Sequence, residues 1–253
     1  MSDRLGGKVA IVVGATSGIG RAVAERFASE GARVVAGSTG ESRSDDRPVE
    51  EAIRDAGGEA TFVECDLRDQ ASLDAMVEAA VAEFGGLDVV CNSAAVITRG
   101  PITETDEADM DFVLDVNLAG PMRLAKAALP ALVERNGTLI NVSSEAGERG
   151  IANLPVYCAS KGGLNTLTKQ LAVEYGPEGV NVNAISPGTT KTAMNEEVRA
   201  TDPEWIERRR EDIPIGSLNE PEDVAELAVY LASGPAKQVN GAVVNIDGGT
   251  TAR

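Results

Sequence analysis

Tyr157 and Lys161 are the two residues of this sequence whose types and spacing point most directly to chemistry. They stand four positions apart in a segment with helical spacing, so both side chains would project from one face of a helix. A lysine ammonium beside a phenol favours the phenolate and lowers the phenol pKa from about 10 toward neutral pH. The pair therefore predicts a general acid/base, although the same spacing also occurs on ordinary helix surfaces.

Two more polar residues could complete a reactive site around this pair. Ser144 stands thirteen positions before Tyr157, after the strand expected at 138–142, where its hydroxyl could bind a reacting carbonyl oxygen. Asn117, in the segment DVNLAG, could anchor the far end of a proton path. We interpret Cys158 as a packing or surface residue, because the chain has no histidine to activate a thiol nucleophile.

A glycine-rich loop lies between the first apolar run, residues 8–13, and the first helical segment. Its glycines, Gly14, Gly18 and Gly20, have the spacing GxxxGxG. Glycines permit positive φ and let backbone amides approach a pyrophosphate, which then sits at the helix N-terminus. A tight turn can need glycine for steric reasons alone, but the position after the first strand of a β-α-β unit favours dinucleotide binding. The loop lacks the GK[ST] ending of a P-loop, which argues against an ATPase.

The end of the second apolar run, residues 34–36, bears on the choice of cofactor. An acidic residue there would hold the ribose 2′-hydroxyl of NAD, but the sequence has Ser38 and Thr39 instead. These hydroxyl residues and the nearby Arg43 could bind a 2′-phosphate, so we expect NADP(H) to be favoured over NAD(H). Glu41 keeps NAD open, and a solvated loop charge is the competing explanation of Arg43.

Short apolar runs alternate with segments of helical spacing along the chain. Residues 19–27 and 73–84 each carry apolar side chains along one helix face. The strands are expected at residues 8–13, 34–36, 61–63, 87–90, 138–142, 180–185 and 242–246. This alternation predicts an α/β protein with a single-domain Rossmann fold over residues 1–253: a doubly wound parallel seven-stranded sheet with helices on both faces. Ligands of such sheets bind at the carboxyl ends of the strands.

Composition excludes several chemistries. The chain has 253 residues and no histidine, which rules out Ser-His-Asp hydrolases, HExxH metalloproteases, Cys-His proteases and two-His-one-carboxylate iron sites, and no metal site is expected. The three cysteines are far apart without a CxxC pair, which fits a reducing cytoplasm. The N-terminus lacks the apolar run of a signal peptide, and no apolar stretch approaches the roughly 18 residues of a membrane span. We therefore expect a cytoplasmic protein with no membrane partner.

The charge balance is strongly acidic. Asp and Glu outnumber Lys and Arg by 40 to 23, which gives a formal net charge of −17. Nucleic acid is therefore not expected as a partner, because its binding needs a basic face. Two explanations of the acidity stay open: adaptation to high intracellular salt in a halophile, where dense carboxylates stay hydrated, or an ordinary acidic cytoplasmic protein.

Taken together, these motifs resemble the classical short-chain dehydrogenases/reductases over nearly the whole chain. The glycine loop resembles that family's TGxxxGIG, with Val13 in place of the threonine. Residues 92–95 resemble its NNAG stretch, with Ser93 and Ala95 as small-for-small changes. The residues that match its catalytic tetrad in order and spacing are Asn117, Ser144, Tyr157 and Lys161.

The resemblance implies an NAD(P)-dependent oxidoreductase that interconverts a secondary alcohol with a ketone or 3-oxoacyl thioester by hydride transfer. Tyr157 would protonate the carbonyl oxygen, and Lys161 would tune Tyr157 and hold the nicotinamide ribose. Ser144 would orient the substrate oxygen, and Asn117 would position a water that feeds protons through Lys161. The cofactor-binding residues that the resemblance implies are Gly14, Thr16, Ser17, Gly18, Ile19, Gly20, Ser38, Thr39, Asp66, Leu67, Asn92, Ala94, Tyr157, Lys161, Pro187, Gly188, Thr190 and Thr192.

The segment 189–216 resembles the lid that sets substrate specificity in this family. It holds Met194, the single tryptophan Trp205 and the run 208–210 of three arginines, which we interpret as a solvated helix face. Carrier-protein-linked ketoreductases of the family often have a basic residue where this chain has Glu178. This argues against a carrier protein and leaves an acyl-CoA or a free ketone as the small-molecule substrate.

Two other functions stay open. One is a sensor or structural protein of the same fold that binds NAD(P)H without turnover, although a sensor would not need all four tetrad residues. The other is a sugar or alcohol dehydrogenase that uses NAD. The resemblance also suggests a homotetramer built on the long helices expected around 107–134 and 155–176.

Overall fold

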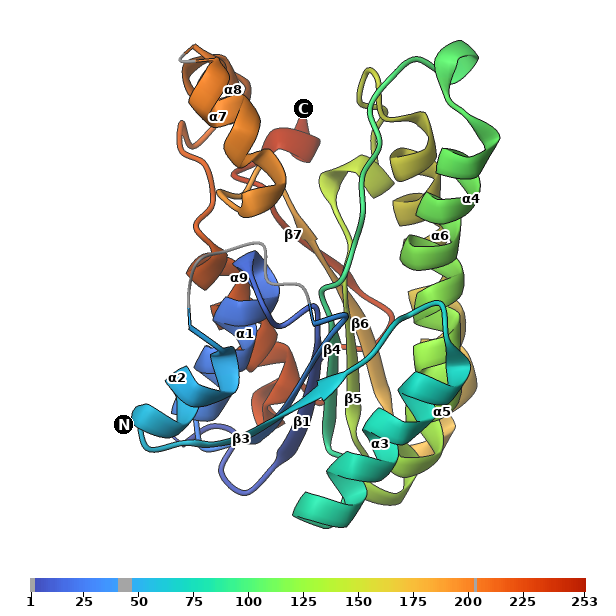
Figure 1. Cartoon of the computed structure of the whole chain (residues 1–253), viewed down its shortest axis with the longest axis vertical. Helices are drawn as coiled ribbons and strands as arrows, with labels where there is room; N and C mark the ends of the chain where they lie inside the picture. Colours follow the sequence, from blue (N-terminus) through green and yellow to red (C-terminus); the bar gives the residue numbers. More distant parts are fainter. Residues whose placement is uncertain (1–2, 41–46, 203) are drawn as a thin grey trace.

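The computed structural model describes residues 3–40, 47–202 and 204–253. At its centre lies a seven-stranded sheet in which all neighbouring strands are parallel, in the order β3-β2-β1-β4-β5-β6-β7 (Figure 1). The strands are β1 (Val9–Val13), β2 (Arg33–Ser38), β3 (Glu59–Glu64), β4 (Val89–Asn92), β5 (Thr138–Val142), β6 (Asn181–Pro187) and β7 (Val243–Ile246). The strand order reverses between β1 and β4, so the predicted doubly wound sheet is confirmed.

Helices cover both faces of this sheet. One face packs against α1, α2 and α9 and the other against α3, α5 and α6 (Figure 1). The α-helices are α1 (Gly18–Ser29), α2 (Val49–Asp55), α3 (Gln70–Phe84), α4 (Glu107–Leu114), α5 (Gly120–Arg135), α6 (Pro155–Tyr175), α7 (Glu196–Thr201), α8 (Trp205–Asp212) and α9 (Pro221–Ala232). Short 3-10 turns occur at Ile102–Glu104, Glu145–Gly147, Gly176–Glu178, Ala193–Asn195, Gly234–Ala236 and Thr250–Ala252. Within the described residues, no helix is both long and apolar enough to cross a membrane.

The alternation of side chains along β1 explains how one strand serves both cores. All five of its residues are at most 2% exposed. Val9, Ile11 and Val13 pack into the core beside α3 and α5, whereas Ala10 and Val12 pack into the core beside α1 and α9. Because successive side chains of a strand point to opposite faces, a continuous apolar run is what a strand covered on both sides requires.

Some predicted boundaries differ from the structure. The strand expected at 87–90 is β4, which extends to Asn92 because this polar residue pairs in register with Val13 and Asn141 at the carboxyl edge of the sheet. The helix expected over 107–134 is divided into α4 and α5 by a π-helical turn, Asp115–Ala119, that contains Asn117. The helix expected over 155–176 is α6 and ends one residue earlier.

Candidate active site

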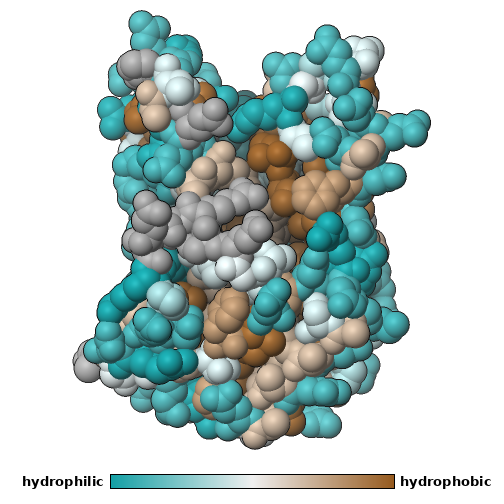
Figure 2. All heavy atoms as spheres, viewed as in Figure 1, coloured by the Kyte–Doolittle hydropathy of each residue, from teal (hydrophilic) through white to brown (hydrophobic). Residues whose placement is uncertain are grey.

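A cavity of about 870 Å³ opens at the carboxyl ends of the strands, where the strand order reverses. Figure 2 shows the hollow between the two lobes at the top of the molecule, with apolar side chains inside it and hydrophilic ones on its rim. The predicted site residues on its wall are Gly14, Thr16, Ser17, Gly18, Ile19, Ser38, Thr39, Asp66, Leu67, Ala94, Ser144, Tyr157, Lys161, Pro187, Gly188, Thr190 and Thr192. Three predicted residues, Gly20, Asn92 and Asn117, do not line it.

Two glycines allow the loop after β1 to form. Gly14 has a φ of +79°, and a Cβ on it would lie 2.8 Å from the amide nitrogen of Ala94. A Cβ on Gly20 would lie 2.1 Å from the Gly14 carbonyl oxygen, so Gly20 supports the loop from behind the wall. α1 begins at Gly18, and Ser17 and Gly18 line the cavity. The free amides of the first helical turn therefore stand at the cavity, where they suit a pyrophosphate.

Hydroxyl groups meet at the ends of β1 and β2. Thr16 Oγ1 and Ser38 Oγ are 3.2 Å apart on the cavity wall. Glu64, the last residue of β3, pairs in register with Ser38 and also lines the cavity. Glu64 was not predicted as a site residue, although its place at the end of a strand was a usable signal. Glu41 and Arg43, which entered the cofactor prediction, lie outside the described residues.

Asp66 lies on the wall where the resemblance implies the adenine. Arg68 Nη2 donates a 2.6 Å hydrogen bond to its Oδ2, and this bond lowers the pKa of Asp66. The same guanidinium lies 5.5 Å from the centre of the Phe112 ring, and both residues line the cavity. Neither Arg68 nor Phe112 was predicted as a site residue, because their approach depends on how α4 packs.

Asn92 and Asn117 lie behind the wall. Asn117 is 1% exposed, and its side chain bonds both polar groups of one backbone residue: Val96 N–H donates to its Oδ1 at 2.9 Å, and its Nδ2 donates to Val96 O at 2.8 Å. Nδ2 also donates to Ser160 Oγ at 3.3 Å. The Asn117 amide thus fixes the segment after β4 and makes no direct contact with Lys161 among these hydrogen bonds. Asn92 Oδ1 is a buried acceptor without a hydrogen-bond partner among the described residues.

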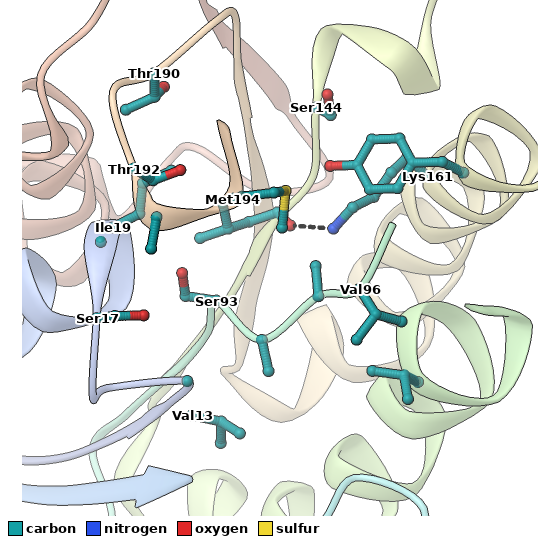
Figure 3. A pocket seen from close by; sticks show the side chains of 18 of the residues that line it. Val13, Ser17, Ile19, Ser93, Val96, Ser144, Lys161, Thr190, Thr192 and Met194 are labelled. Atoms are coloured by element: carbon teal, nitrogen blue, oxygen red, sulfur yellow. Dashed lines mark hydrogen bonds between the residues drawn. The ribbon is translucent and has the colours of Figure 1, made fainter. Parts of the chain in front are cut away.

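Ser144, Tyr157 and Lys161 come together beside the end of β5. Figure 3 shows Ser144 and Lys161 on the same side of the cavity. Burial raises the pKa of Tyr157 to about 12, although the Ser144 hydroxyl opposes this shift. Lys161 is 2% exposed, and burial lowers its pKa to about 8. Its Nζ donates a 2.9 Å hydrogen bond to the Val142 carbonyl and lies 5.7 Å from the centre of the Tyr157 ring. The expected lowering of the Tyr157 pKa is therefore wrong for this structure, because loss of solvation outweighs the effect of a lysine directed at the backbone.

Buried polar contacts hold the end of β5 against α6. Ser143 Oγ donates to Asn165 Oδ1 at 2.6 Å, and Asn165 Nδ2 donates to the Gly147 carbonyl at 3.3 Å. A Cβ on Gly147 would lie 2.8 Å from the Lys161 carbonyl oxygen, so only glycine lets this turn approach the helix so closely. The turn follows Ser144 directly, and the contacts therefore fix Ser144 relative to α6.

The outer part of the cavity combines apolar and charged side chains. Its lining there comprises Val96, Arg99, Glu145, Ile151, Leu154, Met194, Trp205 and Arg209. The interpretation of the run 208–210 as a solvated helix face holds for Arg208, which pairs with Asp202, but not for Arg209. Cys158 packs beside the small apolar cluster that contains Tyr157, in agreement with a packing role.

A parallel doubly wound sheet, a glycine loop at a helix N-terminus and a buried Tyr-Lys pair at the end of one cavity define a nucleotide-dependent oxidoreductase. A family model described as "Enoyl-(Acyl carrier protein) reductase" matches residues 14–251. The chain belongs to the short-chain dehydrogenase/reductase family.

Known proteins resemble the chain over its full length. It is 39% identical over 250 residues to the 2,5-dichloro-2,5-cyclohexadiene-1,4-diol dehydrogenase LinX of Sphingobium indicum, covering 98% of each chain. It is 40% identical over 258 residues to the cis-4-hydroxycyclohexanecarboxylate dehydrogenase of Sinomonas cyclohexanicum, covering 100% of each. A crystal structure of a candidate NAD(P)-dependent gluconate 5-dehydrogenase from Beutenbergia cavernae, with NADP bound at low occupancy, superposes with a TM-score of 0.91 at 35% identity and 100% coverage of both chains. The predicted family and the predicted NAD(P)-dependent oxidoreductase activity on alcohol and carbonyl groups are confirmed.

Proposed function

We propose that this protein interconverts a small secondary alcohol and its ketone, with NADP(H) favoured as cofactor and Tyr157 as the general acid/base. One observation carries the proposal: a single cavity has the glycine loop and the first turn of α1 at one end and Ser144, Tyr157 and Lys161 at the other. An extended dinucleotide that lies along this cavity would bring its reactive ring to the phenol.

The residues present fit such a dinucleotide. Gly14 leaves space that a Cβ would fill, and the amides of Ser17 and Gly18 suit the pyrophosphate. Lys161 and Tyr157 would hold the nicotinamide ribose. The bound cofactor would supply or accept the hydride at the substrate carbon.

The protonation states favour proton donation by Tyr157 at neutral pH. Since burial raises its pKa to about 12, the phenol is neutral and can donate its proton to the carbonyl oxygen during ketone reduction. The Ser144 hydroxyl would orient that oxygen. In alcohol oxidation the phenol must first lose its proton, and the ammonium of Lys161, with a pKa of about 8, would favour the phenolate. Asn117 would act as a positioning residue, because its amide is occupied by Val96 and Ser160.

We favour a small alicyclic alcohol or a polyol derivative as substrate over a 3-oxoacyl thioester. The relatives described above are named for a cyclic diol, a hydroxycyclohexane carboxylate and a sugar acid. The short apolar wall of Ile151, Leu154 and Met194, interrupted by charged residues, also suits a compact polar molecule better than an acyl chain. We propose that the segment 189–216, which contributes Met194 and Trp205, covers this substrate.

Two features at the ribose end of the cavity bear on the proposed preference for NADP(H), one in its favour and one against it. The hydroxyls of Thr16 and Ser38 at the ribose end offer hydrogen bonds without negative charge. The carboxylate of Glu64 on the neighbouring strand opposes a 2′-phosphate and favours NAD. The affinities for NADPH and NADH, measured on the same sample, test this preference, and a clear preference for NADH would overturn it.

We also propose a cytoplasmic homotetramer. A groove of about 450 Å³ between α5 and α6 is lined by Met122, Leu129, Leu171 and other apolar residues, and Val173 on α6 is 80% exposed. Apolar helix surfaces of this kind support self-association. Light scattering that gives the mass of a monomer would refute the tetramer.

Turnover is tested by mixing the purified protein, at low and at high salt, with NADPH or NADH and a panel of ketones. The panel includes alicyclic ketones, keto derivatives of polyols and acetoacetyl-CoA, and loss of the reduced cofactor is followed by its absorbance. Tyr157→Phe should abolish turnover and leave cofactor binding nearly intact, because it removes the proton donor and only one of the many groups that would hold the cofactor. Full activity of this variant would refute the assignment of Tyr157, and cofactor binding without any turnover would favour a sensor.

A further inference from the structure

Two arginines stand at the substrate end of the cavity, although the chain as a whole carries a net charge of −17. Arg99 lies in the segment between β4 and the turn Ile102–Glu104, and Arg209 lies on α8. These two segments rise on opposite sides of the cavity opening (Figure 1). A concentration of positive charge at this place is therefore not explained by the overall composition.

Neither guanidinium has a close carboxylate partner. Within the described part of the chain, no acidic group lies within ion-pair distance of Arg99. Among the described residues, two carboxylates lie near Arg209: the exposed Asp212, at 3.8 Å, and Glu145, whose own 2.8 Å ion pair is with Arg149. By contrast, Arg208 pairs closely with Asp202 outside the cavity. Arg68, which also lines the cavity, pairs with Asp66 at 2.6 Å. At the substrate end, Arg99 and Arg209 have no such short ion pair among the described residues and can bind another anion.

Both charges lie near the Ser144–Tyr157 region of the cavity. Burial raises the pKa of Tyr157, and the charge of Arg99 opposes that effect. Burial also raises the pKa of Glu145, the neighbour of Ser144, and the charge of Arg209 opposes that effect. An electrostatic influence of this kind needs proximity, so Arg99 and Arg209 act on the Ser144–Tyr157 region from two walls.

The surroundings of Arg209 prepare it for an anion. Its guanidinium lies 5.6 Å from the centre of the Trp205 ring, which orients the planar group and shields one face from water. Arginine binds a planar carboxylate through two parallel hydrogen bonds, and shielding from water strengthens them. The apolar side chains of Leu154 and Met194 leave room nearby for the carbon skeleton of a substrate.

Building on the proposed function, we propose that Arg99 and Arg209 form an anion subsite, and that the preferred substrate is a hydroxy acid or keto acid. Its carboxylate would bind the two guanidinium groups while its hydroxyl or carbonyl oxygen meets Ser144 and Tyr157. The reacting carbon and the carboxylate must then be separated by several bonds, as in a ring-substituted or sugar-derived acid.

Matched substrates test this subsite. cis-4-Hydroxycyclohexanecarboxylate and its uncharged amide have nearly the same shape, as do gluconate and glucitol. In Arg99→Gln and Arg209→Gln, kcat/KM for the acids should fall about tenfold to a hundredfold, the range typical of a lost charge-assisted hydrogen bond, and stay within about threefold for the neutral partners. Arg210→Gln is the control, because Arg210 lies on the same helix, does not line the cavity and has Glu207 at 3.5 Å. Equal losses for acid and amide would indicate a merely structural role and overturn the proposal.

A binding measurement gives a result that does not depend on turnover. Trp205 is the only tryptophan of the chain and lines the cavity, so its fluorescence reports on ligands beside Arg209. Titration with cyclohexanecarboxylate should give a saturable change that Arg99→Gln and Arg209→Gln weaken, whereas cyclohexanecarboxamide should give little change. Equal fluorescence responses to the acid and the amide would refute the anion subsite. A stronger response to a phosphate monoester than to the carboxylate would refute the assignment of a carboxylate as its ligand. Turnover of neutral alcohols in the same sample would then leave the proposed oxidoreductase standing, which separates the two failures.

Discussion

Replacing Lys161 with methionine should remove turnover and change how the stability of the protein depends on pH. The side chain is 2% exposed, and burial lowers its pKa from the ordinary 10.5 to about 8. At about 1.4 kcal/mol per pH unit, this difference means that keeping the lysine charged in the folded protein costs about 3 kcal/mol. Methionine has a similar length and no charge, so it removes this cost.

The net gain at pH 7 is smaller than that figure. Lys161 donates a hydrogen bond to the Val142 carbonyl, and its loss leaves a buried acceptor unpaired at a cost of about 1–3 kcal/mol. We therefore expect Lys161→Met to be between neutral and about 2 kcal/mol more stable at pH 7, which corresponds to a rise in Tm of up to about 8 °C.

The pH dependence is the sharper test, because it isolates the titration of one group. Between pH 8 and pH 10.5 the folded protein has lost the Lys161 proton and the unfolded chain still holds it, so the stability of the wild type rises with pH. Between pH 7 and pH 10, the free energy of unfolding of the wild type should therefore rise by about 2 kcal/mol more than that of Lys161→Met.

Urea unfolding followed by circular dichroism at several pH values measures this difference. Lys169→Met, which removes an exposed lysine from the same helix, is the control and should give a curve parallel to that of the wild type. If Lys161→Met also runs parallel to the wild type over this range, Lys161 is not held in a water-poor environment, and the reasoning fails.

Three further outcomes follow from the same geometry. Asn117→Asp would place an oxygen against the Val96 carbonyl in place of a donor, so Tm should fall by about 5–10 °C and kcat should drop. The control Gln238→Glu adds the same charge at an exposed position and should change little. An unchanged Tm in Asn117→Asp would contradict the positioning role. The rate of alcohol oxidation should increase from pH 7 to pH 10, because Tyr157 must lose a proton whose pKa is raised to about 12, and a flat profile would exclude it as the base. Glu64→Gln should raise the ratio of kcat/KM for NADP to that for NAD about threefold to tenfold, and an unchanged ratio would show that this carboxylate does not act at the ribose.

The sheet could be predicted from the sequence because its strands are covered on both faces. The strand expected at 138–142 has the bounds of β5, since each of its residues is buried and β-branched or apolar residues stand on both sides of its one asparagine, Asn141. β4 was placed two residues too early because Asn92, polar by type, is paired within the sheet. The π-helical turn around Asn117 had a local signal that was not used: Pro121, at the start of α5, has no N–H to donate to the Asn117 carbonyl, which interrupts the regular helical hydrogen bonds.

The sequence predicted most residues of the site, but not the direction in which the pKa of Tyr157 is shifted. Spacing in one helix correctly placed Tyr157 and Lys161 on the same side of α6. The direction of the Tyr157 pKa depends on how much water the folded chain excludes, which no local pattern contains. Arg99 and Arg209 were missed for a related reason: each lies in a segment that meets the cavity only through tertiary packing.

The burial of Lys161 depends on the contacts that hold the end of β5 against α6. A lysine keeps a lowered pKa only if water cannot enter, because a relaxed site would return the pKa toward its ordinary value. The bonds from Ser143 and Asn165 and the close approach at Gly147 hold the end of β5 against α6 and leave little freedom for such relaxation. The same contacts fix Ser144 relative to that helix. The arrangement that makes the charged lysine costly is therefore also the one that holds the substrate oxygen and the phenol in a single geometry, as a proton donor in a water-poor site requires.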